Sequence, residues 1–333
     1  MKKFALSIVE KLTSERDLRL PEERSRLGIL EAWFSIIGNL TIALIKFFCG
    51  IFIGSISLLA DAVHTASDVF SSGVVLIGFR ASKKGPDANH PHGHGRIEYL
   101  TGLVISLMLV GAGISFIFTS YERLTTGSVI QPHLLAIFSV LLTIVIKEFL
   151  FHFSYTAGEK IDSEALMADA MHHRSDSLTT IAVLIAIIGA YFNLEFLDAL
   201  FGFLVAGFVI YSGAQIAYKS INRLLGTAPC EETTANLLDS ILNTHGVINA
   251  HDLEVHDYGA QKSITVHIEV NGDLSVNEAH DIADRVENNL REQNKCHAVV
   301  HLDPYEKNSG KKVKNKHHNK SQSEKGDHKE SSK

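Results

Sequence analysis

Six long apolar stretches constrain the fold of this 333-residue chain more than any other feature. A helix needs roughly 20 predominantly apolar residues to cross the hydrocarbon layer of a bilayer. Hydrophobic residues make up 46% of the chain and are concentrated in these stretches, so an ordinary soluble fold is excluded. We therefore predict a lipid-embedded domain of six transmembrane helices, over about 27–53, 57–81, 99–121, 132–155, 164–191 and 196–219.

The second and fifth stretches are near copies of each other. Leu58-Leu-Ala-Asp-Ala-Val-His64-Thr-Ala-Ser-Asp68 recurs as Leu166-Met-Ala-Asp-Ala-Met-His172-His-Arg-Ser-Asp176. His and Asp four residues apart lie on one face of a helix. Two such helices that face each other present two imidazoles and two carboxylates, which complete a tetrahedral shell for Zn²⁺. Because ionisable side chains inside a membrane are costly, we predict a membrane metal site at His64, Asp68, His172 and Asp176.

The positive charges between the stretches predict the orientation of the chain. Lys and Arg gather before the first stretch, in the second-to-third and fourth-to-fifth connections, and after the sixth stretch, whereas the opposite connections offer only Arg123. Both termini are therefore expected to be cytoplasmic. Helices two and five then run in opposite directions, which predicts two inverted three-helix halves with the substrate at their interface.

The composition changes after Gly226. Helical patterns over 231–243 and 275–293 and alternating strands over 250–258, 263–270 and 298–302 give the order αββαβ. This order predicts a small α+β domain over 226–305, with both helices on one side of an open sheet. Residues 1–26 are predicted to be a cytoplasmic segment, 27–225 the membrane domain and 306–333 a disordered Lys/His-rich tail.

Charge excludes one class of partner. The chain outside the tail holds 22 Lys+Arg against 33 Asp+Glu. An acidic protein of this kind suits a cation and gives no reason to expect nucleic acid.

Two histidine-rich clusters lie outside the apolar stretches. The segment Asp87-Ala-Asn-His90-Pro-His-Gly-His94 brings Asp87, His90 and His94 close enough to share a metal ion, the alternative being a solvated polar loop. The C-terminal domain offers further donors, which individually could be half-exposed surface groups. His267 alternates with Val266 and Ile268 and so faces the other side of its strand. These donors are His251, His267, His280, His301 and Asp303.

Together these motifs resemble the cation diffusion facilitator family over about residues 27–304. The resemblance rests on the His-x-x-x-Asp pairs, on His90-Pro-His-Gly-His94-Gly-Arg-Ile-Glu98, and on the His-Asp-Leu start and His-x-Asp-Pro end of the C-terminal domain. It implies a homodimeric exporter that exchanges cytosolic divalent metal for protons. Many members carry an acidic residue where this chain has Gly226, so the partner of Arg96 stays open.

The same resemblance assigns the candidate ligands to three sites. The transport site takes His64, Asp68, His172 and Asp176. The loop site takes Asp87, His90 and His94. A binuclear site between the C-terminal domains of the dimer takes His251, His267, His280, His301 and Asp303.

The sequence thus predicts a secondary active transporter rather than an enzyme, namely a Zn²⁺/proton antiporter in which Zn²⁺ also binds the C-terminal domain. Export of Fe²⁺, Co²⁺ or Cd²⁺ is the alternative, with Mn²⁺ less favoured because it prefers oxygen ligands in octahedral geometry. A membrane-tethered metal sensor would not need the duplicated pair. An intramembrane metallohydrolase would need an open coordination position and a general base, whereas the four predicted ligands close the shell, which argues against this class.

Two further expectations concern the mechanism and the membrane. Asp68 and Asp176 contribute two negative charges, which a divalent ion cancels. We expect His64 and His172 to bind protons as counter-ions when the metal leaves, because histidine titrates near neutral pH. The connection between the fourth and fifth stretches lacks the His-rich insertion common in vesicular eukaryotic members, which favours a prokaryotic inner (plasma) membrane.

The remaining polar residues of the apolar stretches are expected to have ordinary roles. Asp61 and Asp169 could touch the ion, and otherwise they should cap helices or line the entry to the site. His173 points about 100° away from His172 around the helix and should not be a ligand. Lys147 and Glu148 should lie near the cytoplasmic end of the fourth span, where snorkelling or mutual pairing accounts for them.

Overall fold

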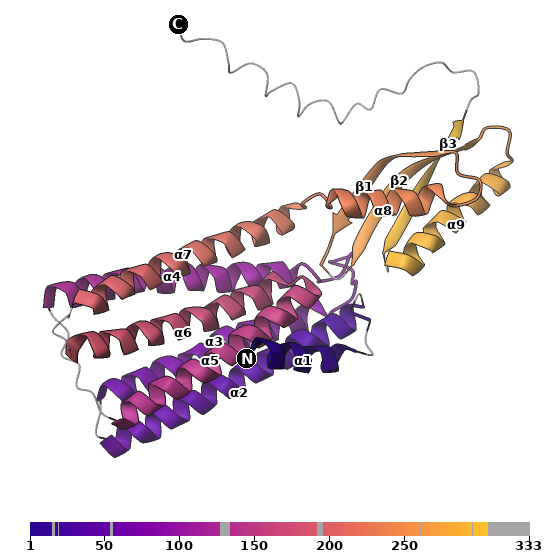
Figure 1. Cartoon of the computed structure of the whole chain (residues 1–333). Coiled ribbons are helices and arrows are strands. Elements are labelled where there is room, and N and C mark those ends of the chain that lie inside the picture. Colours follow the sequence, from indigo (N-terminus) through magenta and orange to yellow (C-terminus); the bar gives the residue numbers. More distant parts are fainter. Residues whose placement is uncertain are drawn as a thin grey trace, which may run out of the picture.

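The computed structural model describes residues 1–14, 17–18, 20–53, 56–126, 134–191, 196–259, 261–294 and 296–305. A long helical bundle carries a small α/β domain at one end (Figure 1). The predicted tail, 306–333, lies outside the described residues.

Six helices of 27 to 33 residues form the bundle. At 1.5 Å per residue even the shortest extends about 40 Å, enough to cross a membrane. Large apolar side chains such as Phe52, Phe70 and Phe118 are exposed on its surface, as lipid contact requires. The prediction of a helical membrane domain is confirmed. Its helices are α2 (Pro21–Ile53), α3 (Ile56–Ser82), α4 (Ile97–Thr126), α5 (Leu134–Ile161), α6 (Glu164–Tyr191) and α7 (Phe196–Leu225).

Over the described residues, five of these helices are long and apolar enough to cross a membrane. The side chains of several apolar residues at the C-terminal end of α6 lie outside the described ones. α6 is as long as α5, and it carries the charged and polar residues of the second His-x-x-x-Asp motif. In space α6 packs against α5, α7 and α4, so it belongs to the same bundle.

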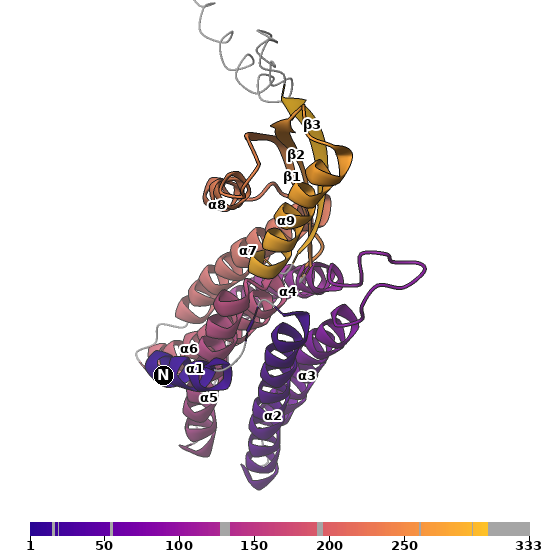
Figure 2. The ribbon, with the colours of Figure 1, turned by 90° about the vertical axis from the view of Figure 1, so that its right-hand side faces the viewer.

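The helices pack as two similar pairs and one pair that joins them. α2 packs along α3 and α5 along α6, while α4 lies along α7 (Figures 1 and 2). Each half of the sequence thus contributes one antiparallel pair, α2 with α3 or α5 with α6, and one further helix. These two further helices, α4 and α7, pack against each other. This is the packing expected of the two predicted three-helix halves.

The N-terminal segment contains a helix that the sequence analysis did not predict. In α1 (Lys2–Thr13) the residues Ala5, Val9 and Thr13 recur every four positions and are buried, which places one face of α1 against α5. Lys160 donates a hydrogen bond of 2.6 Å to Thr13. The first bundle helix begins at Pro21 rather than near 27, because proline fits the first turn of a helix.

The C-terminal domain has the predicted αββαβ order, from α8 (Glu231–Leu242) through β1 (Asn249–Asp257), β2 (Lys262–Asn271) and α9 (Val276–Asn294) to β3 (His297–Tyr305). β2 is central, antiparallel to β1 and parallel to β3. Ile264, Val266 and Ile268 bury one face of β2 against both helices, in a core that includes Leu237 and Val286. Among the described residues, both helices lie on the same face of the sheet and the opposite face is left open (Figure 1).

The connection between α3 and α4 contacts the β1–β2 turn of the C-terminal domain. Arg96 Nε donates to the carbonyl of Asp257 at 3.1 Å, and its guanidinium lies 4.4 Å from the centroid of the Tyr258 ring. His92 stacks on the same ring at 4.3 Å. Gly259, at φ +86°, lets the two backbones approach, since a Cβ there would lie 2.6 Å from the carbonyl oxygen of Gly95. Arg96 thus contacts the β1–β2 turn, through Asp257 and Tyr258.

Candidate metal sites

Three of the four predicted transport ligands converge inside the bundle. Asp68 comes from α3, and His172 and Asp176 come from one face of α6, one turn apart. One donor atom of each lies within 4.8 Å of the others. His172 Nε2 is 3.6 Å from Asp68 Oδ1 and 3.6 Å from Asp176 Oδ2. The group presents two carboxylates and one imidazole, a donor set suited to a divalent metal ion.

The fourth predicted ligand, His64, lies outside this group. It is one turn before Asp68 on α3, yet its side chain is exposed whereas that of Asp68 is buried. Its role as a ligand stays a prediction.

Lys147 contacts the same group, and the sequence interpretation of this residue was wrong. Its ammonium lies 2.7 Å from Asp68 Oδ2 and 2.5 Å from Asp176 Oδ2, and only 1% of its side chain is exposed. It neither snorkels nor pairs with Glu148, which contacts Arg174 instead. The available signal was its place near the middle of an apolar helix, where a lysine needs a carboxylate partner.

The two repeated aspartates have different partners. Asp61 pairs with Lys46 of α2 at 2.8 Å. Asp169 instead joins Glu31 and His173 in a second group of buried donors. The sequence indicates no ligand role for His173 or Glu31, because a contact between α2 and α6 leaves no periodic pattern in either helix.

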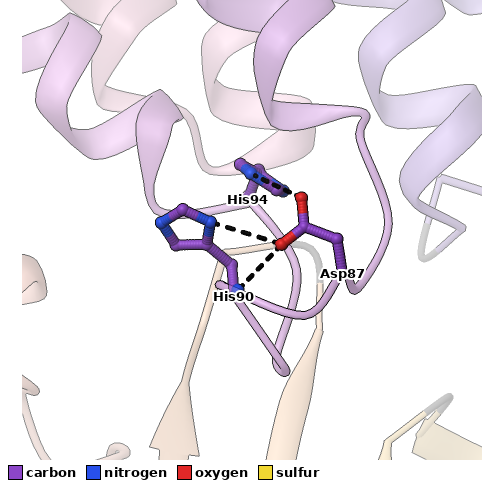
Figure 3. Close-up of side chains that lie close together, drawn as sticks. All are labelled: Asp87, His90 and His94. Atoms are coloured by element: carbon purple, nitrogen blue, oxygen red, sulfur yellow. Dashed lines mark hydrogen bonds and ion pairs between the residues drawn. The ribbon is translucent and has the colours of Figure 1, made fainter.

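The three predicted loop ligands lie together between α3 and α4 (Figure 3). His90 Nδ1 is 3.5 Å from Asp87 Oδ1, and His94 Nε2 is 3.6 Å from Asp87 Oδ2. Lys84 also donates to Asp87, as does the backbone N–H of His90. These hydrogen bonds hold the pKa of the Asp87 carboxyl well below its usual range. Asp87 therefore offers an ionised carboxylate beside two imidazoles.

Three histidines form a row across the open face of the C-terminal sheet. His251, His267 and His301 occupy paired positions on β1, β2 and β3. Asp303 Oδ2 lies 3.0 Å from His267 Nδ1 and 3.3 Å from His251 Nε2, and Asp303 Oδ1 lies 3.6 Å from His301 Nε2. Asp303 can join them because β3 extends to Tyr305, beyond the predicted end at 302.

His280, the fifth predicted ligand of this domain, is not part of the row. It lies on α9, which covers the other face of the sheet, and its imidazole is 3.6 Å from Asp284. Two carboxylates beside His251 were missed. Asp252, at φ +48° in the β1 bulge, lies 3.4 Å from His251 Nδ1, and Glu269 lies 4.0 Å from its Nε2.

A bundle of long apolar helices with acidic and imidazole donors at its centre defines a membrane protein that handles cations. The sequence matches the family described as the cation efflux transmembrane domain over residues 32–225. Residues 229–305 match the cytoplasmic domain of cation efflux proteins. The chain therefore belongs to the cation efflux (cation diffusion facilitator) family, and it is an integral membrane transporter that exports divalent metal cations. The prediction of a transporter rather than an enzyme is confirmed.

Several relatives cover most of this chain. An uncharacterized transporter of Methanocaldococcus jannaschii is 35% identical over 270 residues, 81% of this chain and 95% of its own length. The cation-efflux pump FieF of Yersinia enterocolitica is 30% identical over 262 residues, 78% of this chain and 87% of its own. The manganese efflux system protein MneS of Bacillus subtilis is 28% identical over 279 residues, 83% of this chain and 95% of its own.

Proposed function

We propose that this protein is a Zn²⁺/proton antiporter whose transport site is Asp68, His172 and Asp176, with His64 as the fourth ligand. The observation that carries the proposal is the convergence of donors from α3 and α6 at the centre of the bundle. The match to the cation efflux family supports export of the metal from the cytoplasm. We propose that both termini are cytoplasmic and that the protein lies in a prokaryotic inner membrane.

The donor chemistry supports zinc. Imidazole nitrogen and carboxylate oxygen in a four-coordinate shell suit Zn²⁺, and Fe²⁺, Co²⁺ and Cd²⁺ are the nearest competitors. Mn²⁺ prefers oxygen ligands in octahedral geometry, which this donor set does not supply. One relative is named a manganese efflux protein, so Mn²⁺ is the competitor that must be tested.

Charge balance supports proton exchange. When the metal leaves, Asp68 and Asp176 need another positive charge at membrane depth. The Lys147 ammonium offers one such charge. We propose that protons bound by the site histidines provide the rest and return inward with the carrier.

The C-terminal domain supports a homodimer. Three histidines and Asp303 lie on one open sheet face, and together with His280 these five predicted ligands exceed the four that one closed tetrahedral ion requires. We propose that this face binds Zn²⁺ at a two-fold interface, with His280 as a further ligand of that dimer site, and that Asp87, His90 and His94 hold a weaker site on the loop.

Metal flux into sealed vesicles tests the proposal. Zn²⁺ flux should follow the size and direction of an imposed pH difference and should exceed Mn²⁺ flux under matched conditions. Alanine at His172 or His64 should abolish or greatly slow it, and aspartate at either position should alter metal preference and pH dependence. Equal Mn²⁺ and Zn²⁺ fluxes would refute the selectivity, and indifference to the pH difference would refute the coupling.

A further inference from the structure

Glu31, Asp169 and His173 form a second group of metal-binding side chains inside the bundle. Glu31 comes from α2, and the other two come from α6, one turn apart. None of the three has any exposed surface. One donor atom of each lies within 4.8 Å of the others, and His173 Nε2 is 3.3 Å from Asp169 Oδ2.

The hydrogen atoms available to this group are too few for its acceptors. Ser35 Oγ lies 3.0 Å from Glu31 Oε1, 3.2 Å from Asp169 Oδ2 and 2.9 Å from His173 Nε2. A hydroxyl has one proton and can donate to only one of the two carboxylates. Ser154 donates one more hydrogen bond, also to Glu31 Oε1.

Three donor or acceptor atoms of the group are left without a hydrogen-bond partner among the described residues. They are Glu31 Oε2, Asp169 Oδ1 and His173 Nδ1. A buried polar atom without a partner is costly, and two of these are carboxylate oxygens. The group therefore has unpaired donor and acceptor atoms enclosed in a fully buried part of the bundle.

Among the described residues, the carboxylates of this group also lack a Lys or Arg counter-ion. Lys147 lies between Asp68 and Asp176. Among the described residues, by contrast, no Lys or Arg forms an ion pair with Glu31 or Asp169, and His173 is the one basic group paired with Asp169. Two adjacent buried carboxylates need positive charge, and a divalent cation supplies it at one point.

We propose that Glu31, Asp169 and His173 form a second intramembrane site for a divalent metal ion, with the Ser35 hydroxyl as a fourth ligand. Two carboxylates, one imidazole and one hydroxyl suit Zn²⁺ and its neighbours Co²⁺ and Fe²⁺. The site adjoins the transport group, because the rings of His172 and His173 are 5.9 Å apart. The proposal holds whichever of these metals is exported.

Metal content of the full-length protein in lipid nanodiscs, saturated with Zn²⁺ by dialysis and measured by mass spectrometry, tests the proposal. Glu31→Gln keeps the shape of the side chain but removes a charged ligand, and it should lower the content by one ion per chain. Glu148→Gln is the matched control, a membrane glutamate that contacts Arg174 instead, and it should leave the content unchanged. His173→Gln is a second probe, to be used if the first variant aggregates.

Asp176→Asn separates this site from the transport site. If both exist, Asp176→Asn and Glu31→Gln each lose one ion, and the double variant loses two. Loss in Glu31→Gln but not in Asp176→Asn would refute the transport-site assignment and leave the second site standing. Full metal content in both Glu31→Gln and His173→Gln would overturn the proposal and identify the group as a hydrogen-bonded network only.

Discussion

Replacing Lys147 by methionine should make the transport group bind metal more tightly. The ammonium lies 2.7 Å from Asp68 Oδ2 and 2.5 Å from Asp176 Oδ2, where a divalent ion would also need those oxygens. Methionine has similar length and no charge, so it leaves both carboxylates uncompensated. Removing one partner of a buried ion pair costs about 3–5 kcal/mol. With 1% of the Lys147 side chain exposed, solvent screening does little to reduce this cost.

A bound Zn²⁺ would relieve that cost, and the relief should appear as affinity. At 1.4 kcal/mol per tenfold change, the dissociation constant should fall about 100-fold at the low end of the range and a few thousand-fold at the high end. Without metal, the variant should melt at a lower temperature than the wild type. Competition with a chelating dye gives the affinity, and melting with and without Zn²⁺ gives the stability.

Lys46→Met provides the matched control. Lys46 is also a nearly buried membrane lysine, but it pairs with Asp61, outside the group formed by Asp68, His172 and Asp176. It should lower stability without tightening metal binding at the transport group. Affinity in Lys147→Met that is unchanged or weaker, or an equal gain in both variants, would refute the reasoning.

Two further predictions concern the C-terminal domain. In a fragment covering 227–306, Zn²⁺ should promote dimers and raise the melting temperature. The double substitution His267→Ala with Asp303→Ala should weaken both responses. A fragment that stays monomeric and melts alike with and without Zn²⁺ would count against a metal-bridged interface. Ser275→Ala should lower the melting temperature of the fragment by about 4–8 °C, because Ser275 and Glu278 form a capping box at the start of α9. These hydrogen bonds lower the pKa of Glu278, so the stabilisation by the capping box is present above the unfolded-state pKa and should be lost as the pH falls through the folded-state pKa. Thermal melts from pH 7 to 3 measure this loss. A fall in melting temperature that is no greater for the wild type than for Ser275→Ala would contradict the prediction.

The C-terminal domain was predictable because its signals are local. Alternation along β2 separates His267 from Val266 and Ile268, and that separation places the histidine on the open face. The row with His251 and His301 then follows from strand pairing. Asp303 was also predicted as a donor, and the continuation of β3 past 302 places it on the same strand as His301.

The membrane contacts were predictable where one helix holds both partners, or where the repeated motif pairs two helices, as it does for Asp68 of α3 and α6. His172 and Asp176 could be paired from their spacing, because i and i+4 share a face. Lys147 and Glu31 meet their partners across helix boundaries, and the apolar residues around them look alike on every side. An isolated charge in such a stretch indicates that a partner exists, but the partner is set by which helices pack together.

The position of α6 explains how one helix can carry so many polar residues in a membrane. Every other bundle helix has exposed large apolar side chains, such as Phe52 of α2, Phe118 of α4 and Tyr211 of α7. Among the described residues of α6, from 164 to 182 and at 184 and 185, no side chain is exposed. Over these described residues, packing against α3, α4, α5 and α7 rather than lipid contact sets the composition of α6. His172 and Asp176 can then face α3 while Asp169 and His173 face α2, so a single helix presents donors to two neighbouring groups of potential metal ligands.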